Sequence, residues 1–241
     1  MITKDMNKTQ LTLACISLIA VSASAENATK GQVEKAAQKL AKEENYSWTT
    51  STKEADGSSG RLGTIEGKTD KEKLVFLSFS PGGIPVEVYM KGEKGAAKAL
   101  EGWQTFDEIS ETSGTAAAIV RYLRSYKTPA EQAAELAGKA KELKEKEAAI
   151  SGDLNEDAIK ELLLMGARRR EGQEAPKTSD ANGSVKFWVK DGVLNKYEIH
   201  IEGKVTSGDR VSEINRTLTV EIKDSGATKL EVPDDAKAKM S

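Results

Sequence analysis

The chain has 241 residues, of which 36 are Lys or Arg and 38 are Asp or Glu, so its formal net charge is −2. Proteins that bind nucleic acid usually carry a clear basic excess, and this balance argues against that class. The chain holds one cysteine and one histidine, which leaves little material for transition-metal or thiol chemistry. We therefore expect no nucleic-acid partner, no cofactor and no metal.

The first 25 residues are typical of a secretory signal peptide. Lys4 and Lys8 give a positive start, residues 11–21 form a short apolar run, and Ala23-Ser24-Ala25 supplies small residues for cleavage. The apolar run is shorter than the ~20 residues that a membrane span needs. We expect cleavage after Ala25, a periplasmic or secreted domain of residues 26–241, and no transmembrane span.

The cysteine, Cys15, lies inside this segment, and an alternative interpretation is a lipid-anchored cysteine. Thr12 stands where such an anchor signal normally has Leu, and the apolar run continues past Cys15 to Val21. Both features favour the signal peptide. A domain without cysteine after residue 25 then folds without disulfides, as is common in the bacterial periplasm.

The first part of the mature chain predicts a helix followed by strands. Residues 30–44 place Val33, Ala36, Ala37 and Leu40 on one apolar stripe. Alternating patterns then predict strands at residues 46–53, 62–69, 74–80 and 85–91, and the turns between them favour an antiparallel meander.

The middle of the chain predicts three helices, at residues 116–126, 129–148 and 154–165. Thr128-Pro129-Ala130-Glu131 is a strong helix start. The helix that follows is rich in Lys and Glu, which is typical of a solvated cover, with a partner-binding helix as the alternative. The polar loop at 166–183 holds Arg168, Arg169 and Arg170, which are candidates for binding an anionic group; a helix end with a solvated loop is the alternative interpretation.

The last third predicts strands again. Residues 185–190 and 194–201 flank Asp191-Gly192, a strong hairpin signal. Further strands are expected at 214–223 and, briefly, at 229–232. Without an internal repeat or an obvious linker, the chain predicts one α+β domain.

Two segments carry a family resemblance. They are Val185-Lys-Phe-Trp-Val-Lys-Asp-Gly-Val-Leu-Asn-Lys-Tyr-Glu-Ile199 and Leu230-Glu-Val-Pro-Asp-Asp-Ala236. With the order of elements, they resemble the periplasmic lipoprotein-carrier superfamily of LolA, LolB and LppX-like proteins. The resemblance implies an open antiparallel β half-barrel of about eleven strands, covered by helices and enclosing an apolar cavity for acyl chains.

Most expected strands are apolar on one face and charged on the other, which suits a sheet with one wet side. The candidates for lining a ligand cavity are Trp48, Phe76, Val88, Trp103, Phe187, Tyr197, Ile199 and Val220. The sequence leaves two outcomes open. These side chains line a hollow in a non-catalytic carrier of a lipid or lipoprotein acyl chain, or they form the filled core of a structural protein that binds an envelope partner.

Catalytic constellations are missing from the sequence. His200, the single histidine, alternates with Ile199 and Ile201 and so shares the polar face of its strand with Glu198 and Glu202. A catalytic triad that pairs a nucleophile with histidine would have to use His200, because the chain holds no other histidine, and this residue is expected to be solvated. We therefore expect that the protein is not an enzyme.

Overall fold

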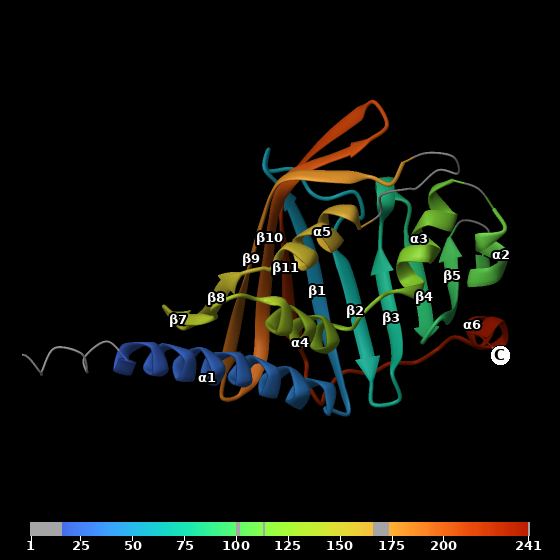
Figure 1. Ribbon diagram of the computed structural model, residues 1–241. Helices are drawn as coiled ribbons and strands as arrows, with labels where there is room; N and C mark the ends of the chain where they lie inside the picture. Colours follow the sequence, from blue (N-terminus) through green and yellow to red (C-terminus); the bar gives the residue numbers. More distant parts are fainter. Residues whose placement is uncertain (1–15, 100–101, 113, 166–173, 241) are drawn as a thin grey trace, which may run out of the picture.

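The computed structural model describes residues 16–99, 102–112, 114–165 and 174–240 (Figure 1). The strands are β1 Asn45–Glu54, β2 Ile65–Asp70, β3 Leu74–Phe79, β4 Val86–Lys91, β5 Lys94–Ala99, β6 Gly102–Thr105, β7 Lys144–Lys146, β8 Ala149–Asp153, β9 Lys177–Lys190, β10 Val193–Ser207 and β11 Arg210–Lys223. The α-helices are α1 Ile16–Ala41, α2 Phe106–Ser110, α3 Thr115–Arg124, α4 Pro129–Lys139, α5 Glu156–Leu164 and α6 Asp234–Met240.

All eleven strands belong to one antiparallel sheet, in the order β6-β5-β4-β3-β2-β1-β11-β10-β9-β8-β7. The chain therefore starts in the middle of the sheet, builds one wing from β2 to β6, and crosses to the far edge through α2, α3 and α4. It then returns through β7 to β11, and β11 pairs with β1. The described strands β6 and β7 are not paired with each other, so the sheet is open. The predicted α+β fold with an open, helix-covered half-barrel is confirmed.

The hairpin expected at residues 191–192 lies where the sequence predicts it. Asp191 and Gly192 have φ values of 55° and 72°, the left-handed pair that a tight hairpin turn requires. The strands on either side are longer than expected: β9 has 14 residues and β10 has 15. Residues 177–183 of the expected loop at 166–183 are therefore the start of β9.

The largest difference from the expected elements lies after α4. This helix starts at the expected capping box, where the backbone N–H and the hydroxyl of Thr128 both donate to the Glu131 carboxylate, at 3.0 and 2.9 Å. It ends at Lys139, however, and the chain then forms the β7–β8 hairpin instead of continuing to residue 148. Glu147 and Ala148 make its two-residue turn with φ values of 54° and 62°.

The remaining differences concern the ends of the chain and the first wing. Helix α1 begins at Ile16, upstream of the expected residue 30, and runs through Ala25. Strands β5 and β6 and helix α2 were not predicted, and the segment 229–232, expected as a strand, is irregular and leads into α6.

The sheet has two faces with different surroundings. The inner face, defined by Trp48, Leu77, Val88, Tyr197 and Val220, packs in one hydrophobic core with side chains of α1, α2, α3, α4 and α5. Figure 1 shows α1, α3, α4 and α5 lying across this side of the strands, with α4 beside α1. We call α1, α3, α4 and α5 the helical cover. The opposite, outer face is polar on most strands, and α6 packs on it against β5 and β6.

Candidate functional site

Strand registers bring six of the eight cavity candidates to the inner face. In the first wing, Trp48 lies opposite Gly67, and the row continues through Leu77 and Val88 to Ala97. In the second wing, Phe187, Tyr197 and Val220 form a row across β9, β10 and β11, and Ile199 follows on the same side of β10. All six candidates, Trp48, Val88, Phe187, Tyr197, Ile199 and Val220, are buried.

Phe76 and Trp103 do not join them. Phe76 pairs with Tyr89, and the two rings lie 4.9 Å apart, while the rings of Tyr89 and Trp103 are separated by 5.6 Å. This aromatic row lies on the outer face, and the C-terminal segment crosses it, with the Tyr89 hydroxyl donating to the carbonyl of Glu231 at 2.9 Å. Phe76 and Trp103 therefore cannot line the same hollow as Trp48.

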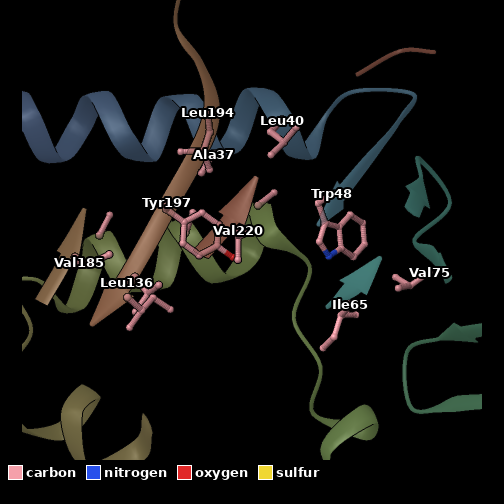
Figure 2. Close-up of a cluster of buried hydrophobic side chains, with 14 of the residues drawn as sticks. Ala37, Leu40, Trp48, Ile65, Val75, Leu136, Val185, Leu194, Tyr197 and Val220 are labelled. Atoms are coloured by element: carbon pink, nitrogen blue, oxygen red, sulfur yellow. The ribbon is translucent and has the colours of Figure 1, made fainter. Parts of the chain in front are cut away.

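The inner face is filled in this structure. Val33, Ala37 and Leu40 of α1, with Ala133 and Leu136 of α4, pack against it and are buried (Figure 2). Two shallow hollows lie on the surface instead. One, of about 520 Å³, lies beside Lys160 and residues 174–178. The other, of about 530 Å³, lies between α4 and α5. None of the cavity candidates lines either hollow.

Polar groups nevertheless gather between the inner face and the helical cover. Four tyrosines, Tyr46, Tyr122, Tyr126 and Tyr197, lie there. Burial raises the pKa of Tyr46 to about 12, although hydrogen bonding with Thr128 and Ala130 acts in the opposite direction. Burial also raises the pKa of Tyr126 and of Tyr197 well above the usual value, and the neighbouring phenols add to this increase. Each phenol is therefore held in its neutral form as a hydrogen-bond donor.

Tyr197 has a defined partner in this cluster. Its hydroxyl donates to the side-chain carbonyl oxygen Oε1 of Gln132, at 2.6 Å. Tyr197 is only 1% exposed, and Figure 2 shows it among Leu194, Val220 and Leu136. A hydrogen bond thus joins the sheet to α4 across this interior.

Trp48 offers a second donor. Its indole lies flat over Gly67, where a Cβ would come within 2.0 Å of the ring. The indole nitrogen Nε1 is buried and has no hydrogen-bond partner of acceptable geometry. Hydrogen bonding with Trp48 lowers the pKa of Tyr126 against the larger effect of burial, so the Tyr126 phenol lies beside the indole N–H. In Figure 2 this nitrogen lies on the edge of the indole that faces Val220 and Tyr197.

Two arginines mark the rim of the cluster. Arg216 of β11 donates to the carbonyl of Leu162 in α5 at 3.3 Å, and its charge counteracts the effect of burial on the pKa of Tyr122. Arg124, at the end of α3, pairs with Asp107 at 2.5 Å. The guanidinium Nε of Arg124 is buried without a partner.

The remaining sequence candidates lie elsewhere. Arg168, Arg169 and Arg170 fall outside the described residues. His200 lies on the outer face of β10, half exposed, with Nδ1 3.2 Å from the hydroxyl of Thr217 and Nε2 3.9 Å from Glu202. Sequence reasoning missed Gln132 and three of the tyrosines. Their signal was available, because Tyr122, Tyr126 and Tyr46 each combine an apolar ring with a polar tip that needs a partner when buried.

The described residues contain no cluster of three or more His, Asp or Glu side chains that could hold a metal ion. Among the described helices, none combines the length and apolar character needed to cross a membrane.

No family model matches the chain, and no curated protein matches it either. Solved structures match it by fold. LppX, a lipoprotein of Mycobacterium tuberculosis, has 10% identity and a TM-score of 0.46 over 86% of this chain and 99% of its own. LprF from Mycobacterium bovis has 8% identity and a TM-score of 0.47 over 87% and 98%.

A LolA-superfamily protein from Nitrosomonas europaea matches with 10% identity and a TM-score of 0.28, over 86% of this chain and 95% of its own. At these identities and TM-scores, the chemistry of the site rests on this chain's own residues.

Proposed function

We propose that this protein is exported and binds, without catalysing a reaction, an apolar ligand such as a lipid or a lipoprotein acyl chain. The ligand lies against the inner face after the α3–α4 segment, residues 115–139, moves aside. The observation that carries the proposal is the indole N–H of Trp48, which is buried between sheet and cover beside the Tyr126 phenol without a well-formed hydrogen bond. The signal-peptide pattern of residues 1–25 supports export.

A buried donor without a well-formed hydrogen bond is rare in folded proteins and costs at most about 1–3 kcal/mol. A core that serves only to stabilise the fold gains nothing from this cost, since an apolar side chain of similar size would avoid it. A ligand that brings an acceptor into the interior removes the cost. The donor therefore favours a core that opens over one that stays closed.

The composition of α4 supports opening. Three of its buried side chains, Ala130, Ala133 and Ala137, are single methyl groups, so each loses only about 1 kcal/mol of apolar burial when the helix leaves. An acyl chain gains about 0.8 kcal/mol for each methylene that it buries, so ten methylenes supply about 8 kcal/mol. Ten methylenes can thus offset the alanine contacts of α4, and longer or paired acyl chains are needed for Leu136, Val120 and Leu123, which lose about 1.5–3 kcal/mol each.

The test uses the chain from Glu26, isolated from a periplasmic fraction without detergent. Native mass spectrometry and solvent extraction show whether a lipid accompanies it in stoichiometric amount. The three tryptophans allow a site-specific measurement: Trp103→Phe with Trp188→Phe leaves Trp48 as the reporter on the inner face. Trp48→Phe with Trp103→Phe leaves Trp188, on the outer face, as the matched control.

We expect added acyl lipid to change the emission of Trp48 and not that of Trp188. A mass without lipid, together with unchanged Trp48 emission in the presence of phospholipids and acylated peptides, would refute the proposal.

The filled inner face favours a second candidate, a structural protein of the envelope that binds another protein through its charged surface. This candidate predicts no ligand under any of these conditions. It also predicts that substitutions at the inner face affect stability alone.

A further inference from the structure

The hydrogen bond between Tyr197 and Gln132 connects the sheet to the helical cover. It joins a phenol on β10 to an amide carbonyl on α4, at 2.6 Å. Tyr197 is fully buried, and its ring stands among Leu194, Val220 and Leu136 (Figure 2). An apolar pair at these positions would fill the same space without two polar groups that must be satisfied.

We infer that the Tyr197 hydroxyl binds the carbonyl oxygen of a neutral acyl ester or amide, and that Gln132 occupies this donor when no ligand is bound. This inference rests on the proposed function and names the ligand class. The carbonyl of a glutamine side chain and that of an ester or amide are acceptors of the same kind. A ligand of this class can therefore replace Gln132 without loss of a hydrogen bond.

The surroundings of Tyr197 favour a neutral group over a carboxylate. The polar groups whose charge affects Tyr197 are other phenols, those of Tyr126, Tyr46 and Tyr122. Arg216 acts on Tyr122, and its guanidinium already donates to the Leu162 carbonyl. A carboxylate beside Tyr197 would be buried without a cation, which is far more costly than burial of an ester.

The position of Gln132 couples opening to recognition. It lies on α4 next to Ala133, which packs against the apolar interior. When α4 moves, the same displacement uncovers apolar surface for the acyl chain and removes the acceptor from Tyr197. A ligand without a carbonyl leaves this buried phenol unsatisfied, so the site discriminates between an ester and an alkane. The indole N–H of Trp48 provides a second donor at the same interface.

The experiment measures binding by the emission of Trp48 in the chain that carries Trp103→Phe and Trp188→Phe. The two probes are methyl palmitate and octadecane, an alkane with the same number of chain atoms, both delivered from cyclodextrin. The measured quantity is the ratio of their affinities, because effects on opening act on both probes and cancel. We expect methyl palmitate to bind about twofold to tenfold more tightly, the range for one hydrogen bond.

Tyr197→Phe keeps the ring and removes the donor, so the ratio is expected to fall to about one. Gln132→Leu removes the competing acceptor: both probes should bind more tightly and the ratio should persist. Tyr89→Phe is the matched control, because it also deletes a phenol with a hydrogen bond, to Glu231, but on the outer face. Its ratio should equal that of the parent. Circular dichroism checks that each variant folds. If Tyr197→Phe does not fold, Gln132→Leu still tests the inference.

The outcomes separate the two levels of the proposal. If neither probe binds, the carrier function itself is wrong. If both probes bind with a ratio near one in the parent, the carrier function stands and the carbonyl site is wrong. The same conclusion follows if Tyr197→Phe keeps the preference for methyl palmitate, or if Gln132→Leu loses it. A short-chain diacyl phosphatidylglycerol and a diacylated peptide then identify the source of the carbonyl, since tighter binding of one shows whether membrane lipid or lipoprotein supplies it.

Discussion

Gly67→Ala tests how closely the first wing packs at the inner face. The indole of Trp48 covers Gly67, and an added Cβ would lie 2.0, 2.2 and 2.5 Å from three ring atoms. The ring cannot swing away freely, because it is 1% exposed and the ring of Tyr46 lies 5.6 Å from it. Overpacking of this kind costs about 1–3 kcal/mol, and the upper part of this range applies here.

A smaller effect opposes the overlap. Replacing glycine by alanine restricts the unfolded chain and stabilises the fold by about 0.4–1 kcal/mol where the backbone conformation is compatible. Gly67 lies in strand β2 without the positive φ that would forbid a side chain. We therefore expect a net loss of about 2 kcal/mol in the free energy of unfolding, measured by urea titration with circular dichroism.

The decisive measurement is a double-mutant cycle with Trp48→Leu. With the indole gone, Gly67→Ala should be neutral or slightly stabilising, so the coupling between the two sites should be about 2 kcal/mol. Gly31→Ala serves as a control, since a Cβ there meets nothing within 4 Å and helix propensity favours alanine. An equal cost of Gly67→Ala in both backgrounds would refute the packing of Trp48 over β2.

Three further predictions concern the cover, the tyrosines and the C-terminal segment. Glu131→Ala removes the acceptor of the Thr128 capping box and should lower the free energy of unfolding by about 1 kcal/mol; an unchanged urea midpoint would contradict this. Burial raises the pKa of the chain's tyrosines, that of Tyr46 to about 12, so the stability that the neutral phenols contribute is complete below pH ~10 and is lost as the pH rises towards ~12. Phenolate absorbance should therefore appear together with loss of circular dichroism, and not before it. Tyr89→Phe removes the hydrogen bond to Glu231 and should make residues 228–240 cleave faster in limited proteolysis, with the rest of the chain unaffected.

The parts of the fold that sequence predicts well are those whose local chemistry and tertiary role agree. Asp191-Gly192 can adopt positive φ at little cost, and its flanking strands alternate, so the hairpin follows from local signals alone. Thr128-Pro129 and Glu131 start α4 in the same way. These positions need no knowledge of the partners across the sheet.

The β7–β8 hairpin shows why other parts escape. Residues 140–148 carry Lys and Glu at helical spacing, and the turn residues Glu147 and Ala148 adopt positive φ without the usual Gly or Asn. Helix propensity is a weak preference that tertiary pairing overrides. Here the pairing of Ile150 with Phe187 extends the sheet and buries both side chains. Gly152 permits the close approach of the Lys141 carbonyl, which a Cβ would meet at 2.5 Å.

The residues of the candidate site also divide into those that a local pattern predicts and those that depend on tertiary pairing. Strand alternation placed Tyr197 on the apolar face, but Phe76 belongs to a strand that is apolar on both faces, and only its register with Tyr89 and the covering C-terminal segment assign it to the outer one. Gln132 is 65 residues from Tyr197 in the chain, and no periodicity connects them. Their meeting depends on the return of the second wing to β1 beneath α4.

The filled interior is the state expected of the proposed carrier when it holds no ligand. Under the proposed function, a carrier without ligand would expose a broad apolar face to water unless something covered it, at about 25 cal/mol for each square ångström. An alanine-rich helix that also brings its own carbonyl to Tyr197 covers that face with few apolar contacts and leaves no donor unsatisfied at this position. Such a cover is held less firmly than a leucine-rich one, and a ligand with the same acceptor can replace it. A closed core with this composition is thus the state that the proposed carrier would adopt between ligands.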